Sequence, residues 1–203
     1  DLEGALVVTE RYQLRGWYRL CSERSWEFTR RLADDEATIE ALARDNQKEL
    51  REGERSELLA LKERYYQEAL RSIESDDFFP GAIGFVIEMR AFELLTAVVS
   101  EAPGARTIIE SLDMGDLFDG FGFAEESAGE GRELYRGVCE GLGVPPEECA
   151  LFSDKNEVLA RGKAAGVATV GIGSSRELEA AERTIVTFSD IEVTSFLAHG
   201  VFA

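Results

Sequence analysis

The spacing of apolar residues divides the chain into two kinds of segment. From about Thr9 to Ile73, apolar side chains recur three or four positions apart, as at Leu14, Trp17 and Cys21, and the stretch contains no proline. This spacing places the apolar side chains on one face of an α-helix. We therefore predict an all-α region here, with the packing of a four-helix bundle.

Beyond the turn-forming run at residues 76–81 (DDFFPG), short apolar segments alternate with amphipathic ones. Strands are expected at residues 94–99, 118–123, 150–153, 168–172 and 184–186. Helices are expected at residues 82–89, 107–112, 132–142, 157–165 and 191–199. Strands separated by helices are typical of βαβ units and a parallel sheet. The predicted fold class is α/β, with a Rossmann-like core at 1–8 and 79–203 and a helical insert at 9–78.

Composition and charge narrow the classes of partner. The formal net charge of −18 argues against nucleic acid, because a polyanion would be repelled. Most of the acids are expected to form a solvated surface, and a saline habitat or a basic partner protein remains open. No apolar run approaches the roughly 20 residues of a membrane span. We expect a soluble, intracellular protein, and the compartment, cytoplasm or organelle stroma, stays open.

Acidic and hydroxyl side chains follow the expected strands. Residues 1–8 resemble the end of a first strand that runs into a loop, and this loop carries Asp1 and Glu3. Ser100 follows the strand at 94–99, and Asp154 follows the strand at 150–153. Ligands of open parallel sheets bind at the carboxyl ends of the strands. Carboxylates suit a hard cation such as Mg²⁺, and a carboxylate can also form an acyl phosphate. The pattern indicates a magnesium and phosphate site, although acidic loops are common in so acidic a chain.

Several segments resemble the haloacid dehalogenase superfamily, closest to its β-phosphoglucomutase-like and phosphoglycolate-phosphatase-like branch. Residues 1–10 (DLEGALVVTE) are similar to the family opening D-x-D-G-(T/V)-L-x-D-(S/T). Residues 9–20 and 61–82 resemble the first and last cap helices, and residues 94–121 resemble the second motif with its helix. Residues 134–173 and 182–197 resemble the fourth-motif segment and the tail. The resemblance covers nearly the whole chain and implies a helical cap inserted in a Rossmann-like core.

The resemblance also implies roles for individual residues. Asp1 matches the aspartate nucleophile, and Glu3 stands at the general acid/base, which is normally Asp. Ser100 matches the hydroxyl that binds the phosphoryl group. Asp1, Glu3 and Asp154 would hold Mg²⁺, and Thr9 matches the hinge threonine, with residues 76–80 as the return crossing.

The departures from the family pattern are mostly losses of positive charge. The motif-three lysine should fall near Gly129 and Glu130, and no lysine lies between there and Asp154. Ser153 replaces a glutamate, Gln13 a cap histidine and Pro103 a basic residue, and the substrate loop is unrecognisable at 33–38. Lys155 is a candidate substitute cation, whereas a solvated loop lysine is the simpler interpretation. His199 stands far from every motif, so a catalytic role for it is not expected.

Two hypotheses follow from these matches and losses. The first is an Mg²⁺-dependent phosphatase or phosphomutase that acts on a small sugar phosphate through Asp1. The second is a relative with impaired or lost catalysis, retained as a binding module that could have a protein partner. The absent lysine favours the second. We also expect an apolar strand upstream of Asp1 in the natural chain, because the family has one there and its neighbours would otherwise expose unpaired edges.

Overall fold

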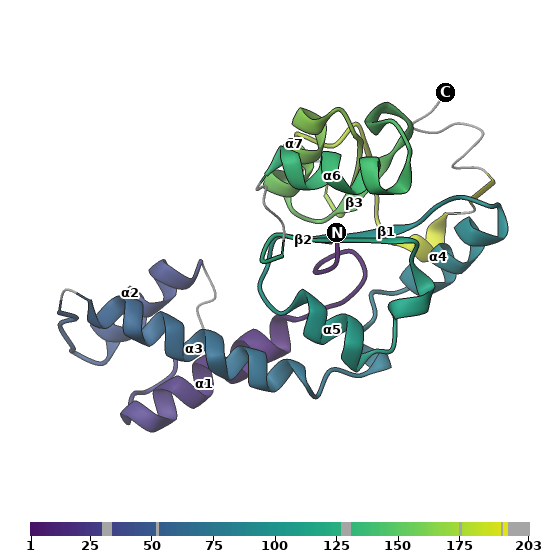
Figure 1. Ribbon diagram of the computed structural model, residues 1–203. Helices are drawn as coiled ribbons and strands as arrows, with labels where there is room; N and C mark the ends of the chain where they lie inside the picture. The colour runs from purple at the N-terminus through teal and green to yellow at the C-terminus, as the bar shows by residue number, and fades with distance from the viewer. Residues whose placement is uncertain (30–33, 52, 127–130, 175, 192, 195–203) are drawn as a thin grey trace. The chain divides into compact units, whose positions relative to one another are not determined.

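The computed structural model describes residues 1–29, 34–51, 53–126, 131–174, 176–191 and 193–194 (Figure 1). The chain forms two compact units. The core unit comprises Asp1–Val8 and Glu74–Ala203, and the helical unit comprises Thr9–Ile73. The return crossing therefore lies at residues 73–74 rather than at the expected 78–79.

Backbone hydrogen bonds explain this shift of the boundary. The amide of Val8 donates to the Asp77 carbonyl at 2.8 Å, and the amide of Phe79 donates to the Leu6 carbonyl at 2.8 Å. Val7 and Phe78 form an antiparallel bridge between these two bonds. The end of the first segment and the returning chain are thus paired inside the core unit.

The described residues of the helical unit form three α-helices rather than four. These are α1 (Glu10–Arg24), α2 (Asp35–Asp45) and α3 (Glu54–Leu70). The carboxylate of Asp34 accepts a hydrogen bond from the Ala37 amide at 2.8 Å and caps α2. The apolar positions pack together as the helical period predicts, in a cluster of Trp17, Leu20, Cys21, Ile39, Leu42, Leu58 and Tyr65. Trp17 of α1 and Tyr65 and Tyr66 of α3 are core residues, as expected, whereas Tyr18 is exposed.

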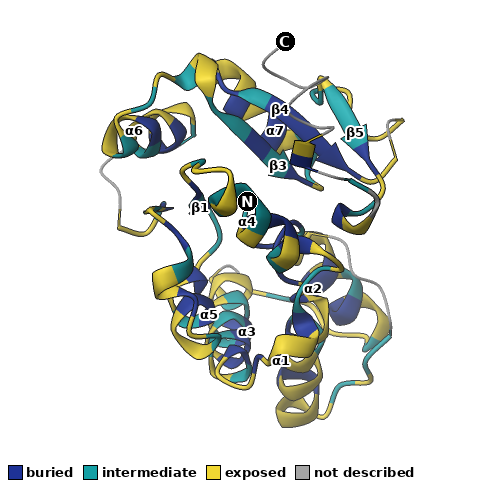
Figure 2. Ribbon diagram, turned by 90° about the vertical axis from the view of Figure 1, so that its right-hand side faces the viewer, coloured by how far each residue is buried: buried dark blue, intermediate teal, exposed yellow. Residues whose placement is uncertain are grey.

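The core unit has the predicted alternation of parallel strands and helices. Strand β1 (Ala97–Ser100) pairs with β2 (Gly120–Phe123), and β4 (Ala168–Ile172) lies between β3 (Ala150–Ser153) and β5 (Arg183–Ile185). The helices are α4 (Ala82–Ala91), α5 (Ala105–Ser111), α6 (Arg132–Leu142) and α7 (Asn156–Ala165). Short 3₁₀ turns are η1 (Ser75–Asp77), η2 (Gly115–Leu117), η3 (Pro146–Glu148) and η4 (Phe188–Asp190). Figure 2 shows that most of β4 is buried, whereas buried and intermediate residues alternate along β3.

Two expected elements differ from the structure. The expected strand at 94–99 begins only at Ala97, because the Leu94 amide bonds back to the Met89 carbonyl at 3.2 Å and ends α4. Glu93 has a φ of 59° there, in the left-handed region. The expected helix at 191–199 lies almost wholly outside the described residues. Among the residues that are described, none of the helices is both long and apolar enough to span a membrane.

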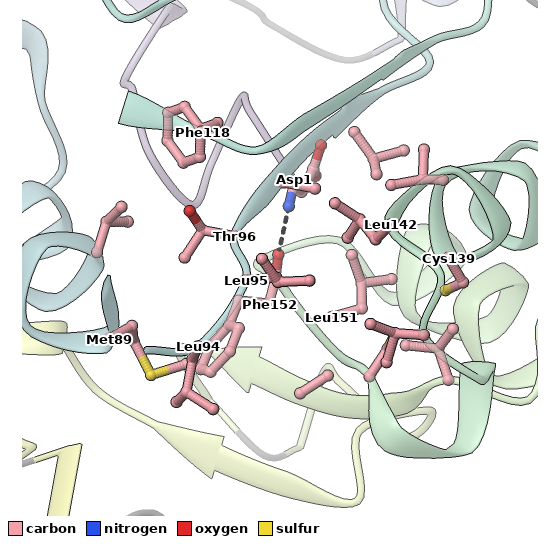
Figure 3. A pocket seen from close by; sticks show the side chains of 18 of the residues that line it. Asp1, Met89, Leu94, Leu95, Thr96, Phe118, Cys139, Leu142, Leu151 and Phe152 are labelled. Carbon is pink, nitrogen blue, oxygen red and sulfur yellow. Dashed lines mark hydrogen bonds between the residues drawn. The ribbon is translucent and has the colours of Figure 1, made fainter. Parts of the chain in front are cut away.

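The strands form two half-sheets, and the first two residues lie between them. The Leu2 amide donates to the Val99 carbonyl of β1 at 3.0 Å. The backbone nitrogen of Asp1 donates to the Phe152 carbonyl of β3 at 2.9 Å (Figure 3). Residues 1–2 are therefore bonded to the inner edges of both β1 and β3.

An apolar cavity of about 580 Å³ adjoins this junction. Its lining comes from both half-sheets and from α4 and α6, and includes Phe85, Met89, Leu95, Ala97, Val99, Val138, Leu142, Leu151 and Phe152 (Figure 3). The edges of β1 and β3 thus border a space that is lined like a protein core.

A strand supplied to this space should stabilise the core unit. We expect five β-branched apolar residues added directly before Asp1 to raise the thermal midpoint by about 5 °C or more. The added strand would pair with the edges of β1 and β3 that no described strand occupies, and it would bury large side chains, each worth about 1.5–3 kcal/mol. Calorimetry measures the shift. A Gly/Ser extension of equal length is the control, and equal midpoints for the two extensions would contradict the expectation.

Asp119 links the start of β1 to α4, and this link should depend on pH. Its Oδ2 accepts from the Thr96 amide at 2.9 Å and from Arg90 Nη1 at 3.0 Å. The Thr96 amide, together with the Arg90 charge, lowers the pKa of Asp119. The stabilisation is therefore present above the ordinary carboxyl pKa, near 4, and is lost as the pH falls through the lower folded value.

Asp119→Asn should lower the free energy of unfolding at pH 7 by about 0.5–1 kcal/mol, since the side chain is partly exposed. As the pH falls below the ordinary carboxyl pKa near 4, the variant should also lose less stability than the parent does. Urea denaturation at neutral and at acid pH measures both effects. Asp116→Asn, at an exposed position in η2, controls for the change in net charge. Identical acid profiles for parent and Asp119→Asn would show that the link contributes nothing.

Candidate functional site

One oxygen of Asp1 is held by the end of β3. The hydroxyl of Ser153, which is fully buried, donates to Asp1 Oδ2 at 2.8 Å. The same hydroxyl accepts from the Lys155 amide at 3.1 Å. Ser153 therefore orients the Asp1 carboxylate and ties it to the loop that leads into α7. The residue that departs from the family pattern at this position has a defined structural role.

Glu3 lies beside Lys155. Its Oε2 is 3.8 Å from Lys155 Nζ, and the side chains are 10% and 38% exposed. The loop of residues 2–7 closes on itself, with the Leu6 amide donating to the Leu2 carbonyl at 3.0 Å. This tight turn uses the left-handed φ of 89° at Gly4. The turn buries the Glu3 carboxylate while the ammonium beside it remains accessible.

Asp154 packs directly against this turn. A Cβ placed on Gly4 would lie 1.9 Å from Asp154 Oδ1, so a side chain at position 4 would have to displace the Asp154 carboxylate. Burial raises the pKa of Asp154, and the Lys155 charge opposes that increase. The Asp1–Gly4 and Ser153–Lys155 loops therefore interlock, with Asp1 bonded to Ser153, Glu3 beside Lys155 and Gly4 against Asp154, and the catalytic and metal-binding roles of these residues stay predictions.

Ser100 is the last residue of β1, which bonds to the first residues of the chain as β3 does. Its side chain is buried, and its Oγ accepts from the Ala102 amide at 3.2 Å. Because Val99 is bonded to Leu2, Ser100 stands one residue beyond the β1 contact with the Asp1 segment. The hydroxyl orders the loop before α5, and its role toward a phosphoryl group stays a prediction.

Glu101, the acid after Ser100, is held by partners of its own. Its carboxylate accepts a hydrogen bond from the Tyr135 hydroxyl at 3.0 Å and forms an ion pair with Arg161. Burial, and then the Glu101 charge, raise the pKa of Tyr135, so the phenol remains protonated and can donate. The Arg161 ion pair offsets the Glu101 charge, and the two contacts join the loop after β1 to α6 and α7.

The donor set departs from an Mg²⁺ site of three acids. Within the ranges that the structure describes, no three His, Cys, Asp or Glu side chains gather closely enough to hold a metal ion. Glu3 faces the Lys155 ammonium, and Asp1 Oδ2 accepts from Ser153. Two of the three acids expected to hold Mg²⁺ thus have other partners, and the arrangement does not fit the expected ligand set.

Three residues named from the sequence, Gly129, Glu130 and His199, lie outside the described residues. Thr9, the expected hinge residue, is the first residue of the helical unit and directly precedes α1. Its role in a hinge stays a prediction.

The sequence reasoning missed a buried cation in the helical unit. Lys62 is 1% exposed, and its Nζ lies 2.8 Å from Asp35 Oδ2 and donates to Gln13. The ammonium also lies about 5.5 Å from the ring centre of Trp17. The signal was available, because Leu58, Lys62 and Tyr66 share one face of α3 at intervals of four residues. A lysine on an otherwise apolar helical face indicates a paired, buried charge.

Comparison with known proteins finds similar proteins that include phosphomutases and phosphatases. No protein-family model matches the chain. The β-phosphoglucomutase of Bacillus subtilis strain 168 is 21% identical over 205 residues, with 94% of this chain and 89% of that protein covered.

Solved structures resemble the chain over nearly its whole length. A β-phosphoglucomutase from Clostridium difficile has a TM-score of 0.75 at 19% identity, covering 98% of this chain and 93% of that one. A predicted phosphoglycolate phosphatase from Haemophilus somnus has a TM-score of 0.79 at 17% identity, covering 96% and 95%. A HAD family hydrolase from Deinococcus radiodurans, with bound phosphate and sodium, has a TM-score of 0.75 at 19% identity, covering 98% and 94%.

The interlock of the two loops can be tested at Gly4. Gly4→Ala should lower the free energy of unfolding by about 3 kcal/mol, because it adds a steric clash with Asp154 to the cost of a left-handed φ. Gly53→Ala is a matched control, since Gly53 has a φ of 88° and no atom within 4 Å of the added Cβ. Its expected loss is about 1–2 kcal/mol. Urea denaturation compares the variants, and equal losses would refute the interlock.

Proposed function

The chain has the fold of the haloacid dehalogenase superfamily and resembles its β-phosphoglucomutase-like branch, and on this basis we propose that it binds a small phosphorylated metabolite at Asp1 and turns it over slowly at most. A sugar phosphate is the proposed ligand class. The names of the relatives, a phosphoglucomutase and a phosphatase, support that choice, and the Deinococcus relative was solved with bound phosphate.

The Glu3–Lys155 contact is the observation that carries the proposal of slow turnover. A general acid at this position must reach the leaving oxygen of the ester, but the described Oε2 of Glu3 lies against Lys155. Glu is also one methylene longer than the usual Asp, and a displacement of about 1 Å can cost on the order of 10²-fold in rate. Relatives with Asp-x-Glu-Gly openings exist, so the substitution alone does not exclude activity.

Charge at the site supports the same conclusion. Asp1, Glu3 and Asp154 are three carboxylates, and Lys155 is the cation beside them. Two unit charges about 4 Å apart interact by roughly 4 kcal/mol at an effective dielectric near 20. Phosphoryl transfer depends mainly on positioning and on neutralising the phosphoryl oxygens. Where the family has its lysine, this chain has Gly129 and Glu130, so a phosphate dianion would be bound weakly.

Mg²⁺, which the resemblance implies, would have Asp1 and Asp154 as ligands, whereas the Glu3 carboxylate is in contact with Lys155. Mg²⁺ prefers octahedral oxygen coordination and is reluctant to lose its waters. We therefore propose weak Mg²⁺ binding. When bound, the ion would offset negative charge at the site.

An active phosphatase or phosphomutase is the second candidate, and the Ser153–Asp1 hydrogen bond favours it. With Oδ2 held by Ser153, Oδ1 of Asp1 could attack phosphorus and form an aspartyl phosphate. The P–O bond to the substrate would break, and Glu3 would give its proton to the departing oxygen. Water would then cleave the acyl phosphate and release inorganic phosphate. A mutase would instead return the phosphoryl group to another hydroxyl of the sugar.

A phosphate-release assay across sugar phosphates, with and without Mg²⁺, separates the two candidates. We expect the parent to exceed the Asp1→Asn blank only slightly. Glu3→Asp combined with Glu130→Lys should raise the rate by about tenfold or more, because it restores the shorter acid and one missing cation. Gly129→Lys is assayed alongside, since the family lysine aligns with either position. Robust turnover by the parent that depends on Asp1 would overturn the proposal of slow catalysis.

A further inference from the structure

Lys155 stands at a position that helix physics disfavours. It is the N-cap residue of α7, and its side chain makes no capping hydrogen bond. N-caps favour short polar side chains, and the positive end of the helix dipole disfavours a cation. The lysine therefore needs a local partner that offsets this cost, and its partner is Glu3.

The backbone of Lys155 is fixed by the site itself. Its amide donates to Ser153 Oγ, which donates in turn to Asp1. The ammonium lies 3.8 Å from Glu3, and its charge also acts on Asp154. Lys155 thus touches, or acts on, each acid that the family would use for Mg²⁺.

From this arrangement we propose that the Lys155 ammonium serves as the cation of the site in place of a divalent metal ion. It neutralises Glu3 in the absence of metal, and it competes with metal for the carboxylates. At 38% exposed, it still has donors free to meet an incoming phosphate, because an ammonium carries three N–H groups. The role toward phosphate rests on the proposed function, whereas the competition with metal does not.

Metal binding by itself tests the competition. Mn²⁺ serves as a paramagnetic probe for the Mg²⁺ position, and electron paramagnetic resonance measures the free ion. We expect weak binding to the parent and about tenfold tighter binding to Lys155→Ser, because the variant lacks the ammonium that contacts Glu3 and one unit of positive charge beside the carboxylates. Lys155→Arg should remain weak. Lys163→Ser, an exposed lysine later on α7, is the matched control and should equal the parent.

The double variant Lys155→Ser with Glu3→Gln tests whether the gain in Mn²⁺ affinity depends on the Glu3 carboxylate. If Glu3 is the ligand that Lys155 blocks, the double variant should lose most of the tenfold gain. Circular dichroism verifies that each variant is folded. Equal Mn²⁺ affinity in the parent and Lys155→Ser, or a gain that survives Glu3→Gln, would overturn the proposal.

Inorganic phosphate is the probe for the anion. ³¹P NMR titration of the parent should give the same affinity in EDTA as in millimolar Mg²⁺, and Lys155→Ser in EDTA should bind about tenfold more weakly. Phosphate binding by the parent that requires Mg²⁺ would overturn the proposal. A parent that binds no phosphate in either condition would overturn the proposed function, while the Mn²⁺ comparison would still decide the role of Lys155.

Discussion

The site depends on two backbone hydrogen bonds, from Asp1 to Phe152 and from Leu2 to Val99. They place one short segment between the inner edges of β3 and β1. Asp1, the acidic loop after it and the hydroxyl that ends β1 are near one another because of this placement. Since parallel strands end at a common edge, a single junction gathers side chains from distant parts of the chain.

A second constraint concerns shape. The turn at Gly4 allows the first loop to touch the Asp154 carboxylate, with no room for a side chain between them. Such close contact brings carboxylates near one another, and the Lys155 ammonium lies beside Glu3 and acts on Asp154. The same packing therefore explains both why the acids converge and why a cation from the chain accompanies them. The chain lacks the lysine that the family has near residues 129–130, and Lys155 supplies a positive charge at the site.

Much of this could be predicted from the sequence. The helical period of α1 and α3, the βαβ alternation, and strands β3 and β4 were visible because periodicity and turn residues report local structure. The convergence of Asp1, Glu3 and Asp154 followed from strand ends and family resemblance. The paired state of Glu101 and the buried charge of Lys62 were not predicted, because both depend on partners that only tertiary packing supplies. The start of β1 was misplaced because Leu94 is apolar yet ends a helix.

The division of the strands into two half-sheets has a consequence for folding order. Each half-sheet is built from neighbouring units, β1–α5–β2 in one and β3–α7–β4 in the other, so its contacts join residues close in sequence. The bonds of Leu2 and Asp1 span about 100 and 150 residues of the chain, respectively. Contacts of such long range carry the largest entropy of loop closure and form slowly. The two halves should therefore form first, and the junction that creates the site should be completed last.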